Sequence, residues 1–241
     1  MNYIHEGEFP KDQMVWRYMR TSRFLDLLQT RQIYFASAWQ FDDPFEGAVA
    51  VQTHAVPVDP RYPEMDSTER AFAELKRLTK ISCWHVEDYE SDAMWRLYSD
   101  QRKGVAIVST PERIGAALTP YRTESGNGVE GLCGGNVTYV DLVQERLRVG
   151  MLERFYFKHR AFSWEKEFRC AISLRGAEEW GVPVAKEGIL VDASLDELIA
   201  EVHIGPSLEP AERESITQAC AKHGLGDRVH VSSLLGRPRY I

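Results

Sequence analysis

The stretch that most constrains the fold is Ser163–Arg169, which reads S-W-E-K-E-F-R. Its alternation predicts a β-strand, because successive side chains of a strand point to opposite faces of the sheet. Glu165, Glu167 and Arg169 would then share one face, and Phe168 would begin an apolar set on the other face that suits a core. Two carboxylates and a guanidinium on an interior strand form either a salt-bridge ladder or the lining of a cleft. If they line a cleft, they are the best candidate active site in the chain.

Composition and charge narrow the class of protein. The chain has 241 residues, of which 44% are hydrophobic and 27% charged, as in ordinary globular proteins. A formal net charge of −7 disfavours non-specific nucleic-acid binding, which depends on Lys and Arg contacts to phosphates, although a local basic groove would still permit it. The four cysteines form no C-x-x-C pair and are expected to be buried thiols in a reducing compartment: Cys83, Cys133, Cys170 and Cys220.

The start of the chain carries no signal-peptide pattern, and no apolar run approaches the ~18 residues that span a bilayer. The expectation is therefore a cytoplasmic protein with no membrane partner.

Hydrophobic periodicity predicts about nine short strands and six or seven helices, in runs rather than in strict alternation. This pattern is typical of an α+β fold with mostly antiparallel, short-strand sheets and flanking helices, here in a single domain over residues 1–241. Two helices and three further segments matter below. They are expected helices at Thr68–Thr79 and Glu145–Arg160, a strand at Ala48–Ala55, a proline-rich loop at His54–Thr68, and a glycine-rich loop at Thr119–Asn136 that is the best candidate for a mobile lid.

The segment Ser37–Gly47 crowds aromatic residues around acidic ones. Its Asp-Asp-Pro step is a turn signal, because the residue before proline avoids the helical region. The aromatic side chains either pack the loop onto the core or form a stacking wall for a planar ring. The residues concerned are Trp39, Phe41 and Phe45 with Asp42, Asp43 and Glu46.

A divalent metal is a possible use of these carboxylates, since Asp and Glu oxygens suit hard cations. Asp42, Asp43 and Glu46 could be joined by the later His85, Glu87 and Asp88. No H-x-x-x-H or comparable spacing supports that reading. Turn-forming Asp side chains explain Asp42 and Asp43 better, so no metal is expected.

Basic and aromatic residues elsewhere suggest contacts to phosphate. Arg17 and Arg169 could clamp a pyrophosphate, because guanidinium groups match phosphate oxygens, although each is more often structural. Lys158 lies in the basic end expected for the Glu145–Arg160 helix, where a solvated helix end is the default and a phosphate contact the sharper alternative. Trp95 and Tyr98 are expected on the core face of a helix, with polar tips that could reach a ligand.

Taken in order, several motifs resemble the bacterial "domain of unknown function 2971" family. They are W-R-Y, Y-F-A-S-A-W-Q-F-D-D-P-F-E, C-W-H, M-W-R-L-Y-S-D-Q-R-K-G-V-A-I, K-H-R-A-F-S-W-E-K-E-F-R and V-H-I-G-P. The resemblance covers the chain from about Met14 to its end, and departs from the family at Asp42, where Asn is expected. It implies a small bacterial protein of the kind found in toxin or phage-defence systems.

A second resemblance is to ADP-ribosyltransferases, and it implies the activity. Those enzymes carry Arg or His on a first strand, a small residue at the end of the next strand, and a catalytic Glu, often in an E-x-E pair. Arg17 or Tyr18 would fill the first position, Ser37 the second, and Glu165-x-Glu167 the third. The resemblance implies NAD as the substrate, with Glu167 as the principal catalytic carboxylate.

The chemistry of the pair agrees with that expectation. Cleaving the nicotinamide–ribose bond passes through an oxocarbenium-like state that a carboxylate stabilises. The second Glu would orient or deprotonate the acceptor, whose identity stays open. ADP-ribosyl transfer or NAD hydrolysis is therefore the leading hypothesis.

Two other classes of function stay open. One is a metal-dependent nuclease or nucleic-acid-binding effector that uses Asp42, Asp43, Glu46 and Glu167 with the basic Arg154–Arg160 end. The other is a non-catalytic module whose aromatic loop docks a protein partner. Stabilisation by a metal or an oligonucleotide, but not by NAD, would favour the first, and the absence of turnover with any nucleotide would favour the second.

Overall fold

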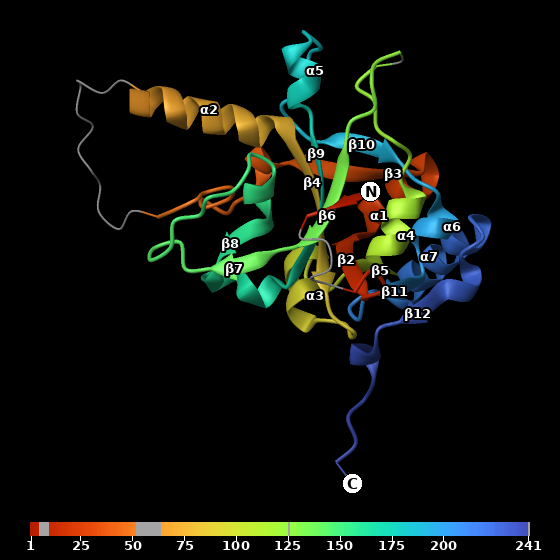
Figure 1. The fold of residues 1–241 in the computed structure, drawn as a ribbon. Coiled ribbons are helices and arrows are strands. Elements are labelled where there is room, and N and C mark those ends of the chain that lie inside the picture. Colours follow the sequence, from red (N-terminus) through yellow and green to blue (C-terminus); the bar gives the residue numbers. More distant parts are fainter. Residues whose placement is uncertain (5–9, 52–63, 125, 241) are drawn as a thin grey trace. The chain divides into compact units, whose positions relative to one another are not determined.

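The computed structural model describes residues 1–4, 10–51, 64–124 and 126–240 (Figure 1). Helices and a mixed sheet of many strands give an α+β fold, as the periodicity predicts. The chain divides into two compact units, each described by itself. Unit 1 comprises Met1–Phe9, Tyr34–Cys83 and Pro120–Leu190, and unit 2 comprises Pro10–Ile33, Trp84–Thr119 and Val191–Ile241.

Unit 1 is built on strands that pair both antiparallel and parallel. β6 pairs antiparallel with β9, with Gly134 opposite Cys170, and parallel with the short β1. β3 pairs antiparallel with β4, with Ala36 opposite Ile81, and β7 and β8 form a separate parallel pair. The bounds are β1 Asn2–Tyr3, β3 Gln32–Ser37, β4 Thr79–Val86, β6 Leu132–Asn136, β7 Thr138–Val140, β8 Phe157–His159 and β9 Glu167–Ser173, with helices α2 Glu64–Leu78 and α5 Arg175–Glu179 and 3-10 turns η1 Ala38–Gln40, η2 Glu153–Tyr156 and η3 Arg160–Glu165.

Unit 2 centres on the fully buried strand β5, whose sequence G-V-A-I-V-S is what a strand covered on both faces requires. β2 and β11 both pair with it antiparallel, and β12 pairs parallel with β11. The bounds are β2 Val15–Arg20, β5 Gly104–Ser109, β10 Ile189–Asp192, β11 Glu201–Ile204 and β12 Val229–Val231, with helices α1 Thr21–Thr30, α3 Asp92–Tyr98, α4 Pro111–Ala117, α6 Leu195–Leu198 and α7 Pro210–Lys222 and turns η4 Gly226–Arg228 and η5 Ser233–Leu235.

A buried lysine fastens a loop inside unit 1. The Lys80 side chain has no solvent exposure, and its Nζ donates to the carbonyls of Arg77 at 2.8 Å, Ala185 at 2.8 Å and Glu187 at 2.5 Å. Burial lowers the pKa of Lys80 to about 8. Three carbonyls thus satisfy the three donors of the ammonium group.

The predicted helix over Glu145–Arg160 is wrong. Its apolar spacing fits a helix, but the segment instead forms η2 and then β8, which pairs with β7. Met151, which the helix would have buried, is 53% exposed, whereas Phe155 is buried. Pairing between β8 and β7 therefore outweighs the local helical periodicity.

Three other segments differ from expectation. Residues 48–51 form no strand, and the rest of the expected Ala48–Ala55 strand lies outside the described residues. The expected Thr68–Thr79 helix is confirmed but begins earlier, at Glu64, inside the expected His54–Thr68 loop, of which residues 54–63 are not described. The end of the expected lid is strand β6, where a Cβ on Gly134 would lie 2.8 Å from the Met1 sulfur. Close packing explains the two glycines of β6, Gly134 and Gly135, whereas a Cβ at Gly126, Gly128 or Gly131 would meet no atom within 4 Å.

Among the described residues, no helix is both long and apolar enough to cross a bilayer. The four cysteines are free thiols: Cys170 and Cys220 are buried, whereas Cys83 and Cys133 are only half-buried, short of the full burial expected from the sequence.

Candidate active site

The two glutamates of the Ser163–Arg169 stretch do not lie on one regular strand. Glu165 ends the turn η3, and β9 begins only at Glu167, so the expectation of one strand through Ser163–Arg169 is wrong at its start. Between them, Lys166 adopts a left-handed backbone with φ of 41°. This residue breaks the alternation, and the two carboxylates converge by a bend in the chain rather than by the pleat of a sheet.

Both carboxylates meet at one ammonium group. Lys158, on β8, donates from Nζ to Glu165 Oε2 and, at 2.8 Å, to Glu167 Oε1. All three side chains are at least nine-tenths buried. Lys158 therefore points inward to the carboxylates and is not part of a solvated helix end.

Arg169 holds the other side of Glu167. Its Nε donates to Glu167 Oε2 at 2.7 Å, and its two terminal nitrogens bind Glu46 Oε1 at 2.6 Å and Oε2 at 3.0 Å. Nη1 also donates to the carbonyl of Phe155 at 2.6 Å. All donors of the guanidinium are thus bound by protein groups. Arg169 binds Glu46, Glu167 and a backbone carbonyl, and not the pyrophosphate that the sequence suggested.

The environment separates the pKa values of the two catalytic candidates. Burial and the neighbouring Glu167 raise the pKa of Glu165 to about 8. Burial also acts to raise the pKa of Glu167, but Arg169 and Lys158 outweigh it and hold that pKa well below its usual range. At neutral pH the proton therefore resides on Glu165, and Glu167 stays ionised between Lys158 and Arg169. Burial raises the pKa of Glu46, and the bound Arg169 opposes that rise.

Two phenylalanine rings and a tyrosine hydroxyl lie next to this network. The ring of Phe162 lies 4.9 Å from Lys158 Nζ, and the ring of Phe41 lies 5.6 Å from Arg169 Cζ, both within reach of a cation–π contact. The Tyr139 hydroxyl accepts a hydrogen bond from the Glu167 backbone at 2.9 Å. Sequence reasoning missed Tyr139, which has no motif, and Phe162, although the latter sits inside the K-H-R-A-F-S run.

The three acidic residues of the loop after η1 have different surroundings. Asp43 Oδ1 accepts from the Phe45 backbone at 2.8 Å, which is the turn-forming use that the sequence predicts. Asp42 is exposed, whereas Glu46 is buried and bound to Arg169. Within the part of the chain that is described, no group of three or more His, Cys, Asp or Glu side chains is arranged to hold a metal ion.

Ser37 has a structural partner within unit 1. It is fully buried at the end of β3, and its hydroxyl lies 3.0 Å from the carbonyl of Lys76 and 3.1 Å from that of Arg77. It therefore satisfies carbonyls at the end of α2.

The remaining cofactor candidates belong to unit 2. The Arg17 guanidinium lies 5.7 Å from the ring of Trp84, and the Tyr18 hydroxyl accepts from the Ser91 backbone at 2.8 Å. Trp95 is fully buried, as expected. Tyr98 is 50% exposed, so its prediction as a core residue is wrong: α3 is short, and its last turn lies at the surface.

The geometry around Lys158 has a chemical meaning. One carboxyl group holds a proton at neutral pH and its neighbour stays ionised, an environment in which acid–base and electrostatic roles are divided between two carboxylates. Glycoside-cleaving enzymes also use two carboxyl groups in different protonation states.

Comparisons with family models, with curated proteins and with solved structures each found no match.

Proposed function

We propose that the chain cleaves NAD at the nicotinamide–ribose bond, as an ADP-ribosyltransferase or an NAD glycohydrolase. The observation that supports the proposal is the sharing of Lys158 by Glu165 and Glu167, whose pKa values are displaced in opposite directions. Strongly perturbed pKa values cluster at functional sites, and a pair of carboxyl groups with separated pKa values divides the acid and base roles.

In the proposed reaction, Glu167 acts as the ionised carboxylate opposite the anomeric carbon. The C1′–N bond breaks, its electron pair leaves with neutral nicotinamide, and Glu167 stabilises the positive charge that develops on the ribose. The oxygen of water or of an acceptor hydroxyl then forms the new bond to C1′.

Glu165 takes the proton that the attacking oxygen loses. A carboxylate with a pKa of about 8 is a stronger base than an ordinary Glu, although only a minority of molecules are ionised at neutral pH. Hydrolysis then balances as NAD and water giving ADP-ribose, nicotinamide and one proton. Lys158 orients both carboxylates and remains protonated throughout.

Trp164 supplies a surface for a planar ring beside this pair. It precedes Glu165 directly in the chain, and its side chain is 45% exposed although its neighbour is buried. Aromatic faces bind the flat rings of nucleotides by stacking. The nuclease alternative has less support, because Arg169 already binds both Glu46 and Glu167.

The test combines titration calorimetry with NAD and an assay of nicotinamide release. Wild type should bind NAD and release nicotinamide, and Glu167→Gln should lose at least 100-fold in kcat while still binding NAD. Glu145→Gln, which removes an exposed carboxylate from the same unit, is the matched control and should retain full activity.

Thermal unfolding of each variant separates lost chemistry from lost folding. If folded Glu167→Gln keeps wild-type turnover, or if wild type neither binds NAD nor releases nicotinamide, the proposal is wrong.

A further inference from the structure

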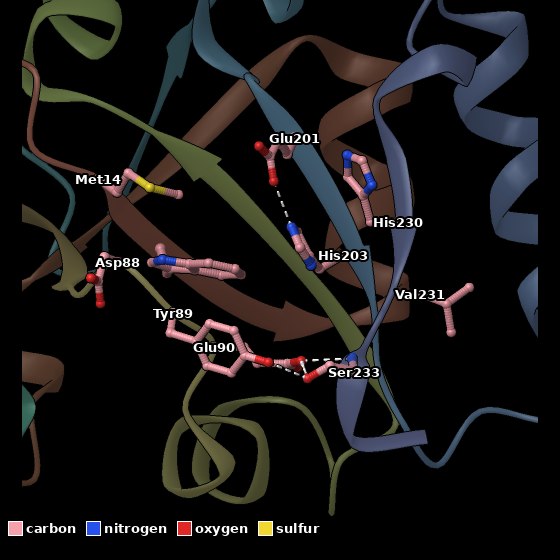
Figure 2. Close-up of a pocket in the computed structure, with 10 residues that line it drawn as sticks. Met14, Asp88, Tyr89, Glu90, Glu201, His203, His230, Val231 and Ser233 are labelled. Atoms are coloured by element: carbon pink, nitrogen blue, oxygen red, sulfur yellow. Dashed lines mark hydrogen bonds and ion pairs between the residues drawn. The ribbon is translucent and has the colours of Figure 1, made fainter. Parts of the chain in front are cut away.

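Unit 2 contains a pocket that the proposed reaction does not use. It has a volume of about 300 Å³, at the lower end of the range for small-molecule sites, and Figure 2 shows the side chains that line it. Of the ten described residues that line it, none is Lys or Arg, and three are carboxylates. The pocket therefore favours a cation.

The three carboxylates lie at separate places in the lining. In Figure 2, Glu201 lies beside His203 and Glu90 lies beside Ser233, while Asp88 lies apart from both. Glu201 Oε2 is 2.8 Å from His203 Nε2, which fixes the orientation of that carboxylate. Two separated negative sites suit a ligand with two positive groups.

Glu90 is held in its ionised form. Its carboxylate accepts from Ser232 Oγ at 2.6 Å, from the Ser233 backbone at 2.7 Å and from Trp95 Nε1 at 2.9 Å. Partial burial acts to raise the pKa of Glu90, but the hydrogen bonds from Ser232 and Ser233 outweigh it and lower that pKa. The negative charge of Glu90 is therefore permanent at neutral pH.

Aromatic rings form part of the pocket wall. The His203 ring is 4.6 Å from the Trp16 ring and 5.2 Å from the His230 ring, measured between centroids. Tyr89 is 60% exposed, and its hydroxyl is 2.8 Å from Ser233 Oγ. Ring faces attract alkylammonium groups and also cover their methylene carbons.

We propose that this pocket binds an aliphatic diamine or polyamine. One ammonium group pairs with Glu201 and the other with Asp88, and the methylene chain lies along Trp16. The carboxylate of Glu90 is already hydrogen-bonded by Ser232, Ser233 and Trp95, so it contributes negative charge to the pocket rather than a direct contact. This site is independent of the glutamate pair in unit 1, so it stands or falls separately from NAD cleavage.

Titration calorimetry at a constant ionic strength of about 150 mM tests the proposal, because salt at that level screens diffuse attraction to an acidic protein. Putrescine and spermidine should bind with a measurable Kd, and the uncharged 1,4-butanediol should not. Glu201→Gln keeps a hydrogen-bond acceptor for His203 but removes the charge, and should weaken spermidine binding at least 5-fold.

Two further variants make the outcome decisive. Asp88→Asn should also weaken binding, whereas Glu197→Gln, an exposed carboxylate outside the pocket in the same unit, should leave Kd unchanged. No binding of spermidine to wild type, equal binding of the diol, or equal losses in Glu201→Gln and Glu197→Gln would each overturn the proposal.

Discussion

Arg169 and Glu46 form a bidentate ion pair, in which both terminal nitrogens of the guanidinium donate to the two carboxylate oxygens. Neither side chain has more than 1% exposure to solvent. The same guanidinium also binds Glu167, which Lys158 binds as well, so these buried charged groups form one connected set. Removing a single partner of such a set leaves charge buried without compensation, which costs more than the net contribution of the intact set.

The Arg169→Met substitution should therefore lower the free energy of unfolding by about 3–5 kcal/mol. Guanidinium chloride unfolding measures the change. Arg175→Met is the matched control, since Arg175 pairs with Glu179 with both side chains more than half exposed, and it should cost less than about 1 kcal/mol. Similar losses in the two variants would contradict the role of burial.

The raised pKa of Glu165 makes stability depend on pH. Its folded-state pKa of about 8 lies above the ordinary 4.5, so the native state holds a proton that the unfolded chain releases between these values. This contribution is complete below about pH 4.5 and is lost as the pH rises to about 8. Glu167, with its lowered pKa, titrates below this window.

Urea unfolding of wild type and Glu165→Gln at several pH values between 5 and 8.5 tests this dependence. The stability of wild type relative to the variant should fall as the pH rises, by up to about 1.4 kcal/mol per pH unit. Parallel curves would mean that Glu165 titrates normally.

The proposed base role of Glu165 predicts the opposite trend for activity. Nicotinamide release should increase with pH and level off above about pH 8, because only ionised Glu165 accepts the proton. Glu165→Gln should lose this limb and fall 10²- to 10⁴-fold in kcat. A wild-type rate that is flat from pH 6 to 9 would exclude Glu165 as the base.

Trp164→Ala tests the proposed stacking surface. The loss of one stacked ring, about 1–3 kcal/mol, should raise KM for NAD roughly 5- to 100-fold and leave the unfolding midpoint nearly unchanged. Trp180→Ala is the control, because Trp180 is 89% exposed in the same unit and adjoins neither carboxylate in the sequence. Equal KM values in the two variants would remove Trp164 from the site.

Gly104→Ala tests the packing of unit 2. A Cβ at this position would lie 2.3 Å from the Met19 carbonyl oxygen and 2.6 Å from Ser99 Cβ, so β2 or the end of α3 must move. The expected loss is about 1–3 kcal/mol or more. Gly131→Ala, where no atom lies within 4 Å of the new Cβ, should leave thermal stability within about 1 kcal/mol of wild type.

Elements with local sequence signals could be predicted. The sequence predicts a helix at Pro210–His223, opened by Pro210 and closed by Gly224, and a buried strand at Gly104–Ser109, and α7 and β5 lie at these positions. The Glu145–Arg160 segment could not be predicted, since pairing between β7 and β8 decides its conformation and a local pattern carries no information on that partner.

The site was predictable in composition but not in geometry. The E-K-E-F-R run identifies Glu165, Glu167 and Arg169, yet the Glu46–Arg169 pair joins residues 123 positions apart. The left-handed Lys166 was also unforeseen, because Lys rarely adopts positive φ and carries no signal for it.

The Lys80 ammonium group acts inside the fold as a cation that is covalently attached to the chain. Three carbonyl oxygens from two separate segments converge on its ammonium group, much as oxygen ligands converge on a bound alkali metal. A free ion would have to bind from solution, whereas the ammonium group of Lys80 belongs to a residue of β4. The closure of the loop at residues 185–187 therefore follows from the folding of β4 and needs no dissolved salt.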